Sequence, residues 1–295
     1  MRRNQTLQLS DGRQLGFAEY GAPDGKPVFF FHGSPSSRLF HHPDEGIAIS
    51  SGARIITIDR PGYGLSNFQP GRKLLDWPDD INVLADALGL DSFAVAGISA
   101  GGPYVAACAY KIPARITNAA IISGVGPTDS KTDTQKLYRK RQITITLARI
   151  APWMLRPLIW WFQNPQRDPE RYFRNIFEES SQPDQAILSR PEIKSMLIQN
   201  WLEGARQGVR GFAWEAVIFA HPWGFPLEEI RIPVNIWHGD ADSSIPLSMA
   251  EQIANAIPNC KLRIIPKEGH FLLFKYWEEI LSNILPETPG NLNED

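Results

Sequence analysis

A serine between two glycines, at the junction of a strand and a helix, is the feature that most constrains this chain. Residues 93–98 are apolar enough for a strand buried on both faces, and residues 104–110 continue as an apolar helix. The intervening Gly97-Ile98-Ser99-Ala100-Gly101 predicts a tight turn with a strained central residue and small neighbours. Ser99 would then stand exposed at the sheet edge beside a helix N-terminus, which is a nucleophile's position.

Length and composition fit one large α/β domain, or such a domain carrying an insertion. The chain has 295 residues, 43% of them hydrophobic, and a net charge of −2, so nothing predicts a nucleic-acid partner. The densest basic run, residues 136–141, is short and predicts a solvated helix face. Cys108 and Cys260 are too few for a disulfide framework, and their apolar neighbours predict buried thiols.

No membrane span is expected. The nearest apolar run, residues 143–162, is interrupted by Arg149, Pro152, Arg156 and Pro157. The first residues, Met-Arg-Arg, are followed by polar residues rather than by the apolar segment of a signal peptide. We therefore expect a cytoplasmic protein.

Alternating strands and helices predict a mostly parallel sheet with helices on both faces. A hairpin is expected from strands at 6–9 and 14–20. Buried strands are expected at the following residues: 27–31, 54–58, 93–98 and 116–123, with a helix at 77–88. The alternation resumes late in the chain with these elements: a strand at 232–237, a helix near 248–257, a strand at 261–265 and a helix over 271–285.

The alternation is interrupted by a long helical stretch. Residues 126–229 show helical patterning without a clear strand and carry six of the nine tryptophans. We therefore expect a core domain made of residues 1–125 and 230–295, with a helical cap inserted at 126–229.

Five polar motifs follow predicted strands, at the edge where an open parallel sheet gathers its site. They are His32-Gly33, the run from Asp59 to Ser66, the Ser99 turn, His238-Gly239-Asp240-Ala241-Asp242, and Gly269-His270. With these motifs, the chain resembles the capped α/β-hydrolase family over residues 6–285. The order Ser, Asp, His also agrees with that fold.

The resemblance implies a role for each motif. Ser99 would be the nucleophile, His270 the general base and then acid, and a carboxylate would orient and stabilise the imidazole. The backbone N–H groups of Ala100 and Ser34 would form the oxyanion hole. Supporting roles are implied for these residues: His32 and Gly33 in the oxyanion loop, and Gly97 and Gly101 in the turn.

Three aspartates compete for the role of the acid. Asp240 and Asp242 both follow the predicted strand 232–237, and the family pattern Gly-x-x-Asp favours Asp242, with Asp240 forming the turn. Some members of the family place the acid after the preceding core strand, which would nominate Asp129. Asp59 is interpreted as a structural residue that shapes the turn beside the site.

The remaining histidines are expected to be structural. We expect His238 to bond the backbone and the others to be solvated or packed: His41, His42 and His221. Because no two histidines have ligand spacing with a matching acid, we expect neither a metal nor a cofactor.

A serine at the tip of the turn narrows the chemistry. Members of the family that open epoxides or displace halide carry an aspartate there, so the expected reaction is acyl transfer to water. The bond would be a carboxylic ester, or a lactone, thioester, amide or carbon–carbon bond beside a carbonyl. Two other readings stay open, a lyase or cofactor-free oxygenase with His270 as base, and a non-catalytic small-molecule receptor.

The inserted region would select the substrate. Its aromatic content predicts a small, mostly apolar molecule, although such residues also build a cap's own core. Four arginines could bind an acidic group, but solvated helix faces explain them as well: Arg149, Arg156, Arg206 and Arg210.

Overall fold

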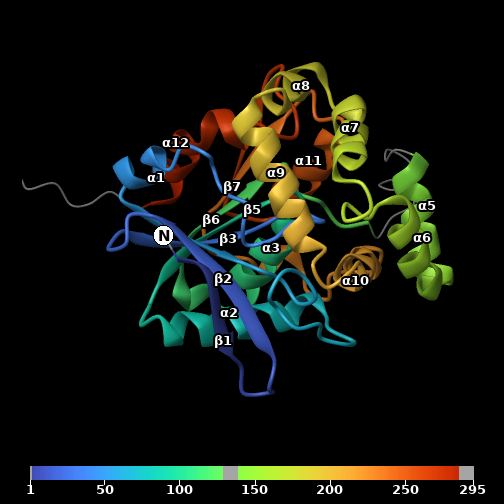
Figure 1. Ribbon diagram of the computed structural model, residues 1–295. Coiled ribbons are helices and arrows are strands. Elements are labelled where there is room, and N and C mark those ends of the chain that lie inside the picture. Colours follow the sequence, from blue (N-terminus) through green and yellow to red (C-terminus); the bar gives the residue numbers. More distant parts are fainter. Residues whose placement is uncertain (1, 129–138, 286–295) are drawn as a thin grey trace, which may run out of the picture.

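The computed structural model describes residues 2–128 and 139–285, which form an α/β structure around one eight-stranded sheet (Figure 1). The strand order is β1-β2-β4-β3-β5-β6-β7-β8, and only the pairs β1–β2 and β2–β4 are antiparallel. The strands are β1 (Arg2–Gln8), β2 (Gln14–Gly21), β3 (Lys26–Phe31), β4 (Ala53–Ile58), β5 (Phe93–Ile98), β6 (Ile116–Ile122), β7 (Val234–Gly239) and β8 (Cys260–Ile265). The mostly parallel sheet predicted from the alternation is confirmed.

The central strands are apolar on both faces because helices cover both. In β3, Phe29 and Phe31 belong to one apolar cluster, while Val28 and Phe30 belong to the cluster on the opposite face. The edge strand β1 was predicted too late, at residues 6–9. It spans Arg2–Gln8, and its mostly polar, exposed residues give no hydrophobic signal because backbone pairing with β2 holds them.

Helices lie on the two faces as the parallel arrangement requires. One face is covered by α2 (Trp77–Ala87), α3 (Gly102–Lys111) and α11 (Leu247–Ala256). The other is covered by α1 (Gly46–Ser50) and α12 (Leu273–Ile284). Short 3₁₀ turns lie at Leu74–Asp76, Ser99–Gly101, Pro113–Arg115, Pro152–Met154 and Leu227–Glu229.

The predicted helical insertion follows β6 and precedes β7. It contains α5 (Arg139–Ile150), α6 (Leu155–Phe162), α7 (Pro169–Glu179), α8 (Gln182–Leu188), α9 (Pro191–Gly204) and α10 (Arg210–Phe219). No strand occurs among its described residues. Asp129 and the start of the basic run at 136–141 lie outside the described residues.

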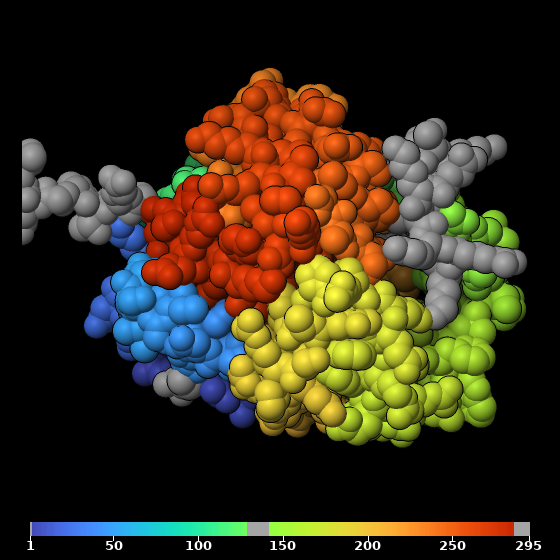
Figure 2. Space-filling view, turned by 90° about the horizontal axis from the view of Figure 1, so that it is seen from above, coloured from blue at the N-terminus to red at the C-terminus, as the bar shows by residue number. Residues whose placement is uncertain are grey.

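The insertion packs against the core rather than standing apart from it. Phe173, Leu197 and Trp201 belong to the same apolar cluster as α1 and α12. Ile159 of α6 shares a second cluster with Met249 of α11. Figure 2 shows the yellow part of the insertion lying directly against the orange and red end of the chain. In Figure 1, α5 and α6 occupy the outer edge of the molecule.

The closest backbone approach in the predicted turn gives a stability test. A Cβ on Gly101 would lie 2.1 Å from the carbonyl oxygen of Phe31, so Gly101→Ala should destabilise the fold by about 2–3 kcal/mol. Gly12→Ala is the control, since that site has φ +83° and open space and should cost only about 1 kcal/mol. Urea denaturation measures both, and equal losses would contradict a steric requirement at Gly101.

Candidate active site

The turn that carries Ser99 is strained, as the sequence predicted. Ser99 begins the 3₁₀ turn between β5 and α3 with φ +55°, a conformation that L-residues other than Asn and Asp rarely adopt. A Cβ on Gly97 would lie 2.8 Å from the carbonyl oxygen of Gly101, so strand and helix approach too closely for a side chain there. The Ser99 carbonyl accepts a hydrogen bond from Val125 N–H at 3.1 Å. The surrounding backbone therefore holds the strained serine in place.

The loop after β3 lies beside Ser99. A Cβ on Gly33 would lie 3.5 Å from Ser99 Cβ and 4.0 Å from its Oγ. The Gly33 carbonyl accepts hydrogen bonds from Arg60 Nη2 at 3.0 Å and His32 Nδ1 at 2.7 Å. Because a trans peptide is planar, the N–H of Ser34 points away from that carbonyl and from Arg60. Arg60 and His32, which donate to the Gly33 carbonyl, thus set the direction of the Ser34 N–H.

His32 is a buried residue that joins two loops beside Ser99. Its ring is fully buried, and burial together with Arg60 holds the pKa of His32 well below its ordinary value. The neutral ring accepts from the backbone N–H of Arg60 at Nε2, so Nδ1 carries the proton donated to Gly33. His32 thereby links the loops that follow β3 and β4.

His270 and Asp242 are brought together at the ends of β8 and β7. His270 Nδ1 lies 2.8 Å from Asp242 Oδ2, while Asp242 Oδ1 accepts from the backbone of Ser244 at 2.7 Å and of Ile245 at 2.9 Å. Burial raises the pKa of Asp242, but attraction and hydrogen bonding by His270 outweigh it, so the pKa lies below its ordinary value. The ionised carboxylate accepts the Nδ1 proton, which makes Nε2 the basic nitrogen of the neutral ring.

The competing aspartates serve other purposes where the structure describes them. Asp240 accepts from the backbone N–H of Lys267 at 2.7 Å, which ties the turn after β7 to the turn after β8. Asp59 is fully buried and accepts from the backbone of Arg38 at 2.6 Å and of Leu65 at 2.8 Å. Asp59 therefore shapes the loops, as interpreted from the sequence.

The other histidines bond backbone or pack against rings. His238 Nε2 lies 3.0 Å from the carbonyl oxygen of Ile245, which confirms the expected backbone contact. His41 stacks on the ring of Tyr20. His42 hydrogen-bonds the Phe274 carbonyl, and His221 hydrogen-bonds the Val217 carbonyl. Within residues 2–128 and 139–285, no group of three or more His, Cys, Asp or Glu side chains is arranged to hold a metal ion.

Asp184 of α8 is a residue at the site that the sequence analysis missed. Its carboxylate is fully buried and accepts from two consecutive N–H groups, those of His270 and Phe271, each at 2.8 Å. A Cβ on Gly269 would lie 2.1 Å from Asp184 Oδ2, so glycine is required before the histidine. In the sequence Asp184 follows Ser181 by three residues, which indicates only the first turn of a helix.

Glu215 of α10 was also missed, and it anchors the loop after β4. Its carboxylate accepts two hydrogen bonds from Arg60, at 2.7 and 2.9 Å, and one from Tyr63 at 2.9 Å. The Tyr63 hydroxyl in turn lies 2.5 Å from Ser34 Oγ. Burial alone would raise the pKa of Glu215, but Arg60 and Arg72 outweigh it and lower the pKa to about 2. Glu215 is therefore an anion held by arginines.

Asn200 of α9 makes a third link from the insertion. Its Oδ1 accepts from the backbone N–H of Ser37 at 2.8 Å, and its Nδ2 donates to Ser36 Oγ at 2.8 Å. Asn200, Ser36 and Ser37 are all buried. The loop after β3 is thus bonded directly by α9, and α10 reaches it through Arg60 and Tyr63.

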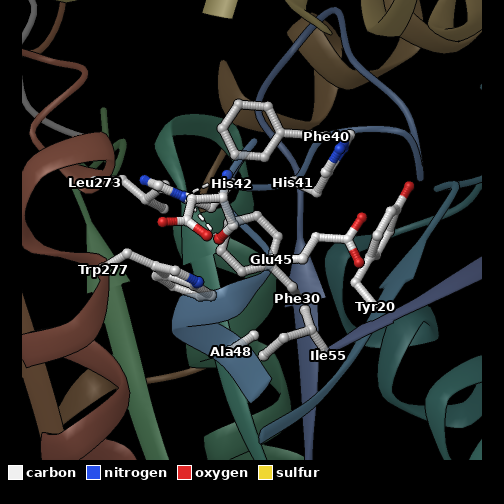
Figure 3. A pocket seen from close by; sticks show the side chains of 11 residues that line it. Tyr20, Phe30, Phe40, His41, His42, Glu45, Ala48, Ile55, Leu273 and Trp277 are labelled. Atoms are coloured by element: carbon white, nitrogen blue, oxygen red, sulfur yellow. Dashed lines mark hydrogen bonds between the residues drawn. The ribbon is translucent and has the colours of Figure 1, made fainter. Parts of the chain in front are cut away.

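A small hollow lies on the face covered by α1 and α12, lined by Phe40, His41, His42 and Trp277 among others (Figure 3). Its volume of about 20 Å³ has room for about one water molecule. None of Ser99, Asp242 and His270 lines it. The hollow is therefore not where a substrate would meet the candidate residues.

The tryptophans of the insertion differ in exposure, and Trp214 is half-buried. Trp201 and Trp223 are buried, whereas these residues are exposed: Trp153, Trp160 and Trp161. The four arginines considered above lie on exposed helix surface or contact the protein itself, as Arg149 does with the carbonyls of Ala220 and Thr128. Of the predicted buried thiols, Cys108 is buried, but Cys260 is only half-buried because it begins the edge strand β8.

Residues 26–275 match the α/β-hydrolase fold family. The chain belongs to this family. It is 25% identical to a non-heme chloroperoxidase of Streptomyces lividans, covering 95% of this chain and 98% of the relative. It is 24% identical to a bifunctional esterase/perhydrolase of Acinetobacter calcoaceticus, covering 90% and 92%.

Solved structures show the same fold. A bromoperoxidase from Bacillus anthracis has a TM-score of 0.71 at 22% identity, covering 95% of this chain and 97% of the other. An esterase from Exiguobacterium antarcticum has a TM-score of 0.70 at 18% identity, with the same coverage. The likeness therefore extends over nearly the whole length, insertion included.

The two N–H groups held by Asp184 give a second test. Asp184→Ala leaves both donors buried and unpaired, so it should destabilise the fold by about 3 kcal/mol. Asp168→Ala is the matched control, because Asp168 accepts one backbone N–H from Arg171 at 2.8 Å at an exposed helix start and should cost about 1 kcal/mol. Urea denaturation compares them, and equal costs would contradict the anchoring role.

The pKa of Glu215 makes stability depend on pH in a defined window. A pKa of about 2 in the folded chain against 4.5 in the unfolded chain corresponds to about 3 kcal/mol. This contribution is complete above pH 4.5 and is lost as the pH falls toward 2. Glu215→Gln should therefore lower the free energy of unfolding at neutral pH. It should also reduce the fall in that free energy as the pH drops toward 2, which we call the acid limb.

Glu228→Gln is the control for that experiment. Glu228 is exposed and belongs to the short turn Leu227–Glu229, so its replacement should leave the acid limb unchanged. Denaturation midpoints across the acid range measure all three proteins. An acid limb as steep in Glu215→Gln as in the wild type would contradict the assignment.

Proposed function

We propose that the chain is a serine hydrolase that cleaves a carboxylic ester through an acyl-enzyme, with Ser99, His270 and Asp242 as its catalytic triad. The observation that carries the proposal is the 2.8 Å His270–Asp242 hydrogen bond on the sheet edge where Ser99 sits with φ +55°. Membership of the α/β-hydrolase fold family supports it. The Acinetobacter calcoaceticus relative named as an esterase/perhydrolase supports the ester as the bond cleaved.

Acylation would begin with attack of Ser99 Oγ on the carbonyl carbon of the ester. His270 Nε2 accepts the hydroxyl proton, and the ionised Asp242 offsets the charge of the imidazolium. The oxyanion of the tetrahedral intermediate would accept hydrogen bonds from the N–H groups of Ala100 and Ser34. The fixed orientation of the Gly33–Ser34 peptide supports this use of Ser34.

The same groups complete acylation and then carry out deacylation. The intermediate collapses when His270 returns its proton to the leaving alcohol, which leaves the acyl group on Ser99 Oγ. His270 then takes a proton from water, and the resulting hydroxide attacks the acyl carbon. The second tetrahedral intermediate collapses as His270 returns this proton to Ser99 Oγ, which breaks the acyl bond and releases the carboxylic acid.

The proposal assigns different roles to the two parts of the chain. Residues 1–125 and 230–295 would form the catalytic core, and residues 126–229 would form a cap that admits a small, mostly apolar substrate. The contacts of α8, α9 and α10 with the loops beside Ser99 and His270 support this placement. We keep a cytoplasmic location and the absence of a cofactor as parts of the same proposal.

Perhydrolysis is a second candidate, favoured by the name of the Acinetobacter calcoaceticus relative. Hydrogen peroxide would replace water in deacylation, attack the Ser99 ester and release a peracid with the serine hydroxyl restored. The two activities share the acyl-enzyme, so they differ only in which nucleophile reaches the acyl carbon.

Replacing the nucleophile tests the proposal. Ser99→Ala should stay folded and lose turnover of short p-nitrophenyl esters by about 10⁴-fold or more. Ser123→Ala is a matched control, because Ser123 also follows a strand with positive φ, at +45°, and its buried hydroxyl has no partner among the described residues.

A fluorophosphonate should form a stable adduct on Ser99 of the wild type, and peptide mass spectrometry locates it. Wild-type turnover in Ser99→Ala would refute the assignment. Labelling that spares Ser99 would favour the lyase reading, in which His270 acts as base without an acyl-enzyme.

A further inference from the structure

The insertion carries an exposed aromatic surface that the catalytic proposal does not use. Five large apolar side chains at the end of α5, in the turn after it and in α6 are between 48% and 75% exposed: Ile150, Trp153, Trp160, Trp161 and Phe162. We call them the aromatic patch. Exposed apolar groups concentrated in one segment mark a contact site more often than isolated ones do.

The patch is not needed to attach α6 to the protein. Leu155 and Ile159 on the other side of this helix are buried in the apolar cluster that includes Val209 and Met249. Two of the exposed rings nevertheless pack against a cation, because the Arg167 guanidinium lies 5.1 Å from the Trp160 centroid and 4.3 Å from that of Trp161. Its Nη1 also donates to the Trp161 carbonyl at 2.7 Å. Trp160 and Trp161 are thus held in place by Arg167 while they face solvent.

The segment around the patch is strongly cationic. The chain carries 30 Lys and Arg against 32 Asp and Glu, yet residues 139–167 contain no acidic residue. Three arginines of this segment have described side chains: Arg149, Arg156 and Arg167. Exposed Arg156 follows Trp153 by three residues and precedes Trp160 by four, which is the spacing of neighbours on one helix face.

We propose that the aromatic patch and its cations bind the surface of an anionic lipid bilayer. Tryptophan side chains favour the interface between head groups and acyl chains, and arginines favour lipid phosphates. No helix within the described residues is long and apolar enough to cross a membrane, so α6 would lie along the surface. In Figure 1, α5 and α6 stand at the outer edge of the molecule, where a planar surface can reach them.

Two other occupants fit the charge and the side chains less well. A two-fold contact between copies of this chain would bring the same cations face to face, which is repulsive. Nucleic acid would match the charge, but Ile150 offers no face for base stacking and gains from transfer into hydrocarbon. The inference does not depend on the proposed hydrolase activity, because binding can be measured without turnover.

Co-sedimentation of the full-length chain with vesicles tests the proposal. The protein should sediment with vesicles containing phosphatidylglycerol, much less with pure phosphatidylcholine, and less at high salt. The double variant Trp153→Ser/Phe162→Ser and the single variant Arg156→Glu should each weaken this binding by about tenfold or more.

The matched controls make the same two kinds of substitution on β8, away from the patch: an apolar residue to serine and a cation to glutamate. Ile264→Ser removes an apolar side chain that is 43% exposed, and Lys261→Glu reverses an exposed charge, and both should bind as the wild type does. Sedimentation and circular dichroism of all variants keep folding defects separate from binding defects.

Three results would overturn the proposal. The first is no binding of the wild type to anionic vesicles at low salt. The second is equal loss in the β8 controls and the patch variants. The third is an oligomer in vesicle-free solution that the patch variants dissolve, or preferential binding to single-stranded DNA in competition, since either would assign the patch to another partner.

Discussion

The buried ion pair between Arg60 and Glu215 is the interaction on which the candidate site depends most. Arg60 follows β4 and Glu215 lies on α10, and both side chains are almost fully buried. The same guanidinium donates to the carbonyls of His32 and Gly33, beside Ser99. Removing one partner would leave the other charge buried and unpaired, at a cost of about 3–5 kcal/mol. One pair therefore joins the sheet, the loop after β3 and the insertion.

The same arrangement recurs at two further places. Asp184 of α8 holds the backbone of His270, and Asn200 of α9 holds the backbone of Ser37. Each of the three insertion helices thus contributes one buried polar side chain to a loop beside the candidate residues. Such groups stabilise only when fully paired, so the loops and the insertion must be correctly placed together. We conclude that the insertion holds the loops of the candidate site in place.

The sequence was most informative where the physical cause is local. The Ser99 turn follows from glycine spacing between an apolar strand and a helix, whereas the preference for Asp242 over Asp240 came from the resemblance to the family. Asp184 and Glu215 give no such signal, because their partners His270 and Arg60 lie 86 and 155 positions away. Helical periodicity predicts that a face is buried but does not indicate which distant donor it meets. The edge strand β1 was misplaced for a related reason, since backbone pairing leaves no trace in hydropathy.

The claim that the insertion holds the loops of the candidate site is tested most directly by native-state hydrogen exchange. The amides of His270, Phe271 and Ser37 are bonded to side chains of the insertion, so they should exchange only when the whole chain unfolds. Their exchange free energies should then equal that of global unfolding and fall with denaturant at the same slope. Exchange of these amides through a low-energy opening that is insensitive to denaturant would contradict the account.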